Sequence, residues 1–102
     1  MHGVVGEGEV AADDDGLRTA TGEIVDLAVD GCVVRANRSI GPDLAGRVRI
    51  ELAGNATWLP VITRSVRPDS RGWTVECAFD RLTPDKQRVV AGLLSDRDRL
   101  TA

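Results

Sequence analysis

Apolar and polar residues alternate most clearly in two segments of the chain, 47–52 and 73–79. In 47–52 the apolar residues take every second position, and arginine or glutamate takes the positions between them. Because the side chains of a strand point alternately to its two faces, both segments are predicted to be strands with one buried face. The second strand would direct four apolar side chains inward: Trp73, Val75, Cys77 and Phe79.

Weaker signals predict further strands. The segment 58–66 contains Pro60, which has no backbone N–H and therefore indicates a sheet edge or a bulge. β-branched and other apolar residues between turn-forming residues mark the remaining strands. These strands are a first one around Val4, Val5 and Val10, followed by an acidic turn at 13–16, and two more at 17–27 and 32–36.

One helix is predicted at 83–97. Thr83 is a favourable N-cap, and Pro84 is tolerated at the first helical position. Apolar residues follow at the spacing of one helix face, and the helix is expected to fray from Arg97 to Arg99. The predicted apolar face consists of Val89, Val90, Leu93 and Leu94.

Together these elements predict a mainly β fold, a small six-stranded antiparallel β-barrel with one C-terminal α-helix. A chain of 102 residues fits a single domain. Within the domain 1–102 we assign an acidic, Gly- and Asp-rich segment to 1–16, the barrel strands to 17–82 and the helix to 83–97.

Charge is spread unevenly along the chain. Residues 1–30 carry eight acidic side chains and one basic one, a net charge of −7, whereas residues 31–75 carry seven arginines and three acids, a net charge of +4. The arginines can form a face that holds a phosphate-bearing ligand, or they can lie beside the acidic strands and be neutralised. With a net charge of −3 and few aromatic residues, the chain is not expected to be a general nucleic-acid binder.

The residues that most catalytic sites need are missing from the sequence. The single histidine is His2, and there is no phosphate-binding loop and no nucleophile elbow. The carboxylates at 13–15 indicate a solvated turn, because they lack the spacing of a calcium loop. We therefore predict no enzyme activity, no catalytic residues, no metal and no cofactor. With no long apolar segment and no signal peptide, a cytoplasmic protein without membrane insertion is expected.

Two further residue types allow more than one role. Cys32 and Cys77 lie in predicted strands among apolar neighbours, which favours buried structural thiols over reactive ones. Trp73 is in phase with the core positions of its strand, so it is expected in the core. Trp58 follows a hairpin turn, and its exposure is left open.

The stretch from Gly22 to Leu94 resembles a PilZ domain. The segment 24–34 is similar to the strand–turn–strand motif of that family, [D/N]-x-S-x-x-G, with Asp26 and Gly31 at matching positions and Ala28 at the serine position. Val61–Arg67 is similar to a late strand of the family, Gly72–Phe79 to the strand that closes its barrel, and Leu82–Leu94 to its terminal helix. The order and spacing of these segments carry the resemblance.

The resemblance implies a bacterial regulatory domain of the kind that binds cyclic di-GMP, with Asp26, Ala28 and Gly31 at ligand-binding positions. Members that bind this ligand have an R-x-x-x-R motif before the first strand, whereas residues 1–17 here contain no arginine. Ala28 also lacks the hydroxyl group of the motif serine. The residues themselves favour a purely structural role for the motif, in which Asp26 accepts turn N–H groups and Gly31 adopts a positive φ.

Three functions follow from these observations. The first is a divergent PilZ-like domain with weak or no cyclic di-GMP binding that acts through a protein partner. The second is a genuine cyclic di-GMP receptor that contacts phosphates through a different set of arginines, Arg35, Arg64 and Arg67. The third is an unrelated small barrel that binds nucleic acid through the central arginines.

Overall fold

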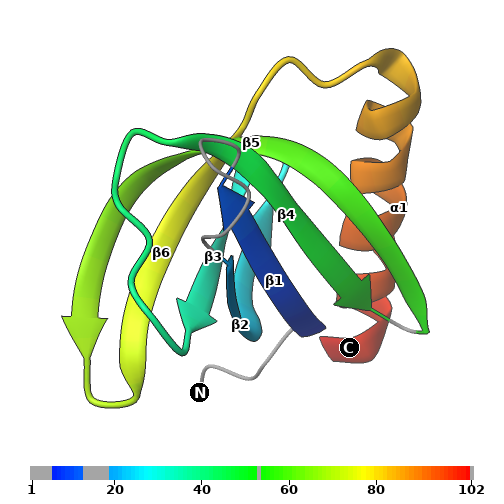
Figure 1. Cartoon of the computed structure of the whole chain (residues 1–102). Helices are drawn as coiled ribbons and strands as arrows, with labels where there is room; N and C mark the ends of the chain where they lie inside the picture. The colour runs from blue at the N-terminus through cyan, green and yellow to red at the C-terminus, as the bar shows by residue number, and fades with distance from the viewer. Residues whose placement is uncertain (1–5, 13–18, 53, 102) are drawn as a thin grey trace.

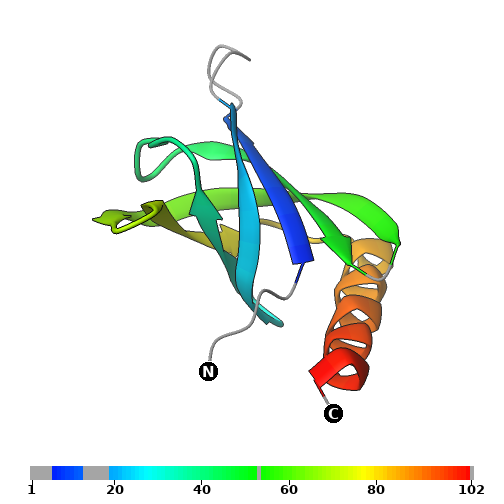
Figure 2. The same ribbon diagram turned by 90° about the horizontal axis from the view of Figure 1, so that it is seen from below.

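The strands predicted from alternation form one closed sheet. The computed structural model of the chain describes residues 6–12, 19–52 and 54–101. Six antiparallel strands close into a barrel in the order β1-β2-β3-β6-β5-β4, and one helix follows (Figures 1 and 2). The elements are β1 (Gly6–Ala12), β2 (Thr19–Ala28), β3 (Gly31–Ala36), β4 (Ala45–Leu52), β5 (Asn55–Asp69), β6 (Gly72–Phe79) and α1 (Pro84–Thr101).

The first strand lies within the acidic segment 1–16 and closes the barrel. β1 pairs with β2 on one side and with β4 on the other. Val10 and Ala12 are buried, so this segment supplies core side chains as well as charge. Val4, Val5 and the predicted turn at 13–16 lie outside the described residues.

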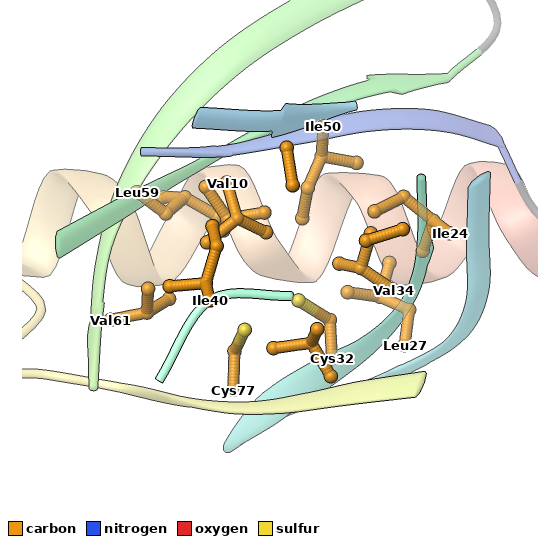
Figure 3. Packing of buried hydrophobic residues seen from close by; sticks show 14 of the residues in the cluster. Val10, Ile24, Leu27, Cys32, Val34, Ile40, Ile50, Leu59, Val61 and Cys77 are labelled. Carbon is orange, nitrogen blue, oxygen red and sulfur yellow. The ribbon is translucent and has the colours of Figure 1, made fainter. Parts of the chain in front are cut away.

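Inward-facing aliphatic side chains from all six strands fill the barrel (Figure 3). The predicted alternation in β4 is confirmed, because Val48, Ile50 and Leu52 are buried. In β6 the two central residues, Val75 and Cys77, are buried. The outer pair is different: Trp73 and Phe79 at the strand ends are only half-buried.

Pro60 occupies an edge position, as predicted. Residues 55–60 of β5 pair with β4, but β6 joins β5 only from Val61 onward. The backbone N–H of Asp80 donates to the Pro60 carbonyl at 2.9 Å, which marks the end of the β5–β6 ladder. Pro60 therefore lies in the part of β5 that pairs with β4 alone. No second strand needs the backbone N–H that proline lacks.

The helix begins as predicted but extends further. The backbone N–H of Lys86 donates to the Thr83 hydroxyl at 3.2 Å, which confirms Thr83 as the N-cap. The expected fraying at Arg97–Arg99 is wrong, because α1 continues to Thr101. Two contacts explain the extra turn: Arg97 donates to the Leu27 carbonyl of β2, and Arg99 forms an ion pair with Asp96 one turn earlier.

One side of α1 packs against the barrel. Val90 and Leu93 are buried in the same cluster as the strand residues, and Leu94 is partly buried against it. Val89 was assigned to the same face but is 37% exposed. The packed face is therefore narrower than the apolar stripe in the sequence, because the barrel covers the helix along one line only.

Candidate functional site

The residues of the strand–turn–strand motif line a surface groove of about 260 Å³. The groove lies where the end of β2 and the start of β3 meet β6 and the middle of β5. It brings together segments that are far apart in the sequence. Its lining consists of Asp26, Ala28, Asp30, Gly31, Cys32, Val33, Arg64, Glu76, Cys77 and Ala78.

Two β-bulges shape this groove. In β2 the register with β3 shifts between Ile24 and Asp26, and in β5 the register with β6 shifts between Thr63 and Ser65. A bulge inserts one extra residue, bends the strand and changes the direction of the side chains near it. The extra residue in β5 is Arg64, which is how an arginine of the central basic block reaches the motif.

The motif residues have mainly backbone roles. Asp26 is exposed, and its Oδ1 accepts the backbone N–H of Leu27 at 2.9 Å. Gly31 does not have a positive φ, so the expected left-handed turn conformation is wrong. Instead, a Cβ at this position would lie 2.2 Å from the carbonyl oxygen of Cys77. Gly31 therefore allows β3 and β6 to approach closely.

The three arginines proposed as phosphate contacts do not gather at one place. Arg64 lines the groove with Asp26, Ala28 and Gly31. Arg67 pairs with Glu76, with 3.2 Å between Nη2 and Oε1. Arg35 lies on another part of the surface, between Glu23 at 3.8 Å and Asp69 at 3.5 Å.

The groove is acidic. Three carboxylates, those of Asp26, Asp30 and Glu76, line it together with a single guanidinium group, that of Arg64. Arg67 contributes a second positive charge from outside the lining, and its ion pair with Glu76 offsets the charges of both side chains. An anion that enters the groove therefore meets more negative than positive charge.

Two cysteines lie behind the wall of the same groove with their side chains in the barrel core, and sequence reasoning did not pair them. Cys32 of β3 and Cys77 of β6 are directly opposite each other, and both are free and buried. Their mutual hydrogen bond, together with burial, raises the pKa of Cys32 well above its ordinary value. The same hydrogen bond lowers the pKa of Cys77. The shared hydrogen bond stabilises the Cys77 thiolate, so Cys77 is the more acidic thiol.

A second groove, of about 410 Å³, adjoins the first at Asp30. It is more apolar than the first and lies between the β2–β3 turn and the start of α1. Val29, at the tip of that turn, is 75% exposed. The lining consists of Val29, Asp30, Phe79, Leu82, Gln87 and Val90.

The exposed tryptophan already has a partner within the chain. Trp58 of β5 is 37% exposed, and the guanidinium carbon of Arg47 lies 5.0 Å from its ring centroid. This is a cation–π contact across the β4–β5 pair. One face of the indole ring is therefore occupied by an arginine of the neighbouring strand.

Two classes of site are missing from the described residues. Among them, no three His, Cys, Asp or Glu side chains are grouped so that they could hold a metal ion. None of the helical residues in the described part forms a segment long and apolar enough to cross a membrane.

Similarity to known proteins is detectable in the fold and not in the sequence. No protein-family model matches this chain, and no curated protein matches it. A solved structure does: the PilZ domain of CeSA from a cellulose-synthesizing bacterium. The two share 20% sequence identity and superpose with a TM-score of 0.69 over 91% of each chain. The fold of this chain is therefore the six-stranded barrel with a C-terminal helix that this PilZ domain has.

Proposed function

We propose that this chain is a divergent PilZ-type regulatory domain without catalytic activity, which binds cyclic di-GMP weakly or not at all and acts through a protein partner. The observation that carries the proposal is the charge of the groove at the motif positions. Cyclic di-GMP has two phosphate groups, and here Asp26 and Asp30 line the groove beside Arg64, while Glu76 is paired with Arg67.

Missing contacts lower the binding free energy of cyclic di-GMP considerably. A charge-assisted hydrogen bond contributes about 1.5–3 kcal/mol, and the serine hydroxyl that Ala28 replaces contributes about 0.5–1.5 kcal/mol. Every loss of about 1.4 kcal/mol weakens a dissociation constant tenfold. Each charge-assisted contact that the groove lining does not supply therefore weakens binding about tenfold or more, before the repulsion from Asp26 and Asp30 is added.

The protein partner is supported by the second groove. Val29 projects an apolar side chain into solvent at the edge of the second groove, where Phe79 and Leu82 are half-buried. Exposed apolar surface bordered by polar residues is typical of protein contact sites. This groove adjoins the motif positions at Asp30, which supports a partner contact next to the place where ligand-binding members of the family hold cyclic di-GMP.

Calorimetric titration of the purified, folded chain with cyclic di-GMP at low and moderate salt tests the proposal. We expect a dissociation constant above about 100 µM, which corresponds to less than about 5.5 kcal/mol of binding free energy. A variant with Asp26→Asn, Asp30→Asn and Glu76→Gln should bind more tightly than the wild type, because it removes the repulsion. Circular dichroism confirms that both chains are folded.

The second candidate, a receptor with a non-standard arginine set, is favoured by the position of Arg64 alone. Micromolar binding by the wild-type chain would overturn the first proposal and support this one. Arg64→Ala should then abolish binding. Arg35→Ala is the matched control, because Arg35 is held by Glu23 and Asp69 away from the groove.

A further inference from the structure

Hydrogen bonds on two sides hold the walls of the second groove in place. The backbone N–H of Phe79 donates to the Asp30 carbonyl at 2.9 Å, which fixes the β2–β3 turn against the end of β6. On the other side, the Nε2 atom of Gln87 in α1 donates to the Leu82 carbonyl at 3.1 Å. The groove is therefore formed by the fold itself, as most sites for small ligands and side chains are.

The two polar side chains of this groove both offer hydrogen-bond acceptors. Asp30 is the one charged residue of the lining, and its carboxylate has no ion pair or hydrogen bond within the described part of the chain. Because Nε2 of Gln87 donates to Leu82, its Oε1 atom remains as an acceptor. An apolar groove whose polar groups are acceptors fits a ligand with an apolar body and a cationic donor.

Basic residues next to the lining do not cancel the charge of Asp30. Arg81 is preceded by Asp80, so the charges of these two side chains offset each other. Lys86 of α1 donates from Nζ to the Trp58 carbonyl of β5 at 3.1 Å, so it is engaged with another strand. A carboxylate attracts cations over about 8 Å at 0.15 M salt, which covers a side chain held in the groove.

We propose that the second groove binds a partner segment in which a basic residue follows an apolar one, with the apolar side chain against Phe79 and Leu82 and the cationic group at Asp30. The inference rests on the proposed function, because it names the chemistry of the partner at the same surface. Val29, which is largely exposed at the turn, adds apolar contact at the open end of the groove.

An NMR titration of the isotope-labelled, folded chain with capped peptides tests the proposal. Each peptide is acetyl-Gly-Leu-X-Gly-amide, where X is lysine, glutamine or glutamate. We expect the lysine peptide to shift the amide signals of Asp30, Leu82 and Gln87 with a dissociation constant of about 1 mM. The glutamine peptide should bind about two- to fivefold more weakly, the effect of one exposed ion pair, and the glutamate peptide more weakly still.

Three variants separate the charge contact from the apolar contact. Asp30→Asn should remove the difference between the lysine and glutamine peptides. Asp43→Asn is the matched control, because it removes the same charge outside the lining, at a φ of 59° that asparagine also tolerates. The control should keep the lysine preference. Val29→Ser should weaken all three peptides by the same factor, because it reduces apolar contact alone.

Equal binding of the three peptides would overturn the inference and leave the partner surface itself in place. Absence of binding up to about 10 mM, or shifts confined to other faces of the barrel, would overturn it as well. The proposed function fails on a different result, micromolar binding of cyclic di-GMP in the calorimetric titration. The peptide comparison on the wild-type chain needs no variant, so it decides the question even if a substitution unfolds the domain.

Discussion

Packing alone requires glycine at position 31, without any ligand. Its backbone conformation is available to any residue, but the Cys77 carbonyl occupies the space that a side chain would need. Gly92 in α1 is the opposite case, because a Cβ there would meet nothing within 4 Å.

We predict opposite effects for the same change at these two glycines. Gly31→Ala should lower the free energy of unfolding by about 1–3 kcal/mol, because the strands must shift to admit a methyl group. Gly92→Ala should raise it by up to about 1 kcal/mol through the higher helix propensity of alanine. Urea denaturation of the two variants and the wild type measures both effects. Equal effects of the same sign would contradict the packing explanation.

The pKa of Asp69 responds to the contacts of its side chain. Its carboxylate accepts the Arg71 backbone N–H at 2.7 Å and the Thr74 hydroxyl at 2.8 Å, and it lies 3.5 Å from Arg35. These contacts, chiefly that with the Arg71 N–H, hold the pKa of the Asp69 carboxyl below its ordinary value.

A lowered pKa makes the contribution of Asp69 depend on pH. The ionised carboxylate stabilises the fold above the ordinary pKa of aspartate, and this stabilisation is lost as the pH falls through the lower folded-state pKa. We expect wild type to be more stable than Asp69→Asn at neutral pH and the two to converge in acid. Urea titrations at a series of pH values measure the difference, and a gap that persists in strong acid would argue against a charge effect.

At the scale of elements, α1 is held by few residues. Val90 and Leu93 are buried in the barrel core, while Val89 points largely to solvent. The apolar stripe in the sequence did not distinguish these positions, because residues of similar hydropathy lie on both sides of the line that the barrel covers.

Alanine substitutions along α1 should reflect this difference. Leu93→Ala should lower the free energy of unfolding by about 2–5 kcal/mol, the range for a buried leucine. Val89→Ala should change it by less than about 0.5 kcal/mol. Thermal or urea denaturation distinguishes the two variants. A large loss of unfolding free energy in Val89→Ala would instead show that Val89 packs against the barrel.

Some elements could be predicted from the sequence more easily than others. The β4 alternation and the Thr83 N-cap needed only local patterns, so both were confirmed. β1 was hard to see because its buried positions are Gly8, Val10 and Ala12, whose small side chains give a faint alternation. Gly8 must be small because Ile24 fills the space above it.

The groove was less predictable than the strands. Asp26 and Gly31 were found by motif, but Arg64 reaches them through a bulge, and a bulge has no periodic signature in a sequence. The pairing of Cys32 with Cys77 depends on the register of β3 with β6, two strands that are far apart in the sequence. The register between β3 and β6 depends on the packing of the whole barrel, so neither strand's sequence determines it alone.

At the scale of the whole molecule, the register neutralises much of the charge asymmetry of the sequence. Glu9 of β1 lies opposite Arg49 of β4, and Glu23 of β2 lies opposite Arg35 of β3. Opposite charges at directly paired positions are close and stabilise the sheet. Two arginines of the central basic block therefore face acids of the first third of the chain.

The pairing of arginines with acidic residues argues against nucleic-acid binding. We expect no detectable binding of a single-stranded oligonucleotide at about 0.15 M salt, because phosphate contacts need an accumulation of unpaired basic side chains. Fluorescence anisotropy of a labelled oligonucleotide measures it. Tight binding that falls steeply with added salt would instead favour the nucleic-acid hypothesis.

The short stretch of β5 that β6 leaves uncovered has a consequence for self-association. A free strand edge can accept a strand from another molecule and seed aggregates. Here Pro60 offers no N–H at that edge, and Lys86 of α1 donates to the neighbouring Trp58 carbonyl at 3.1 Å. Pro60 therefore provides no hydrogen-bond donor at this edge, and Lys86 occupies the carbonyl acceptor of Trp58. We therefore do not expect this edge of β5 to pair with a strand from another molecule.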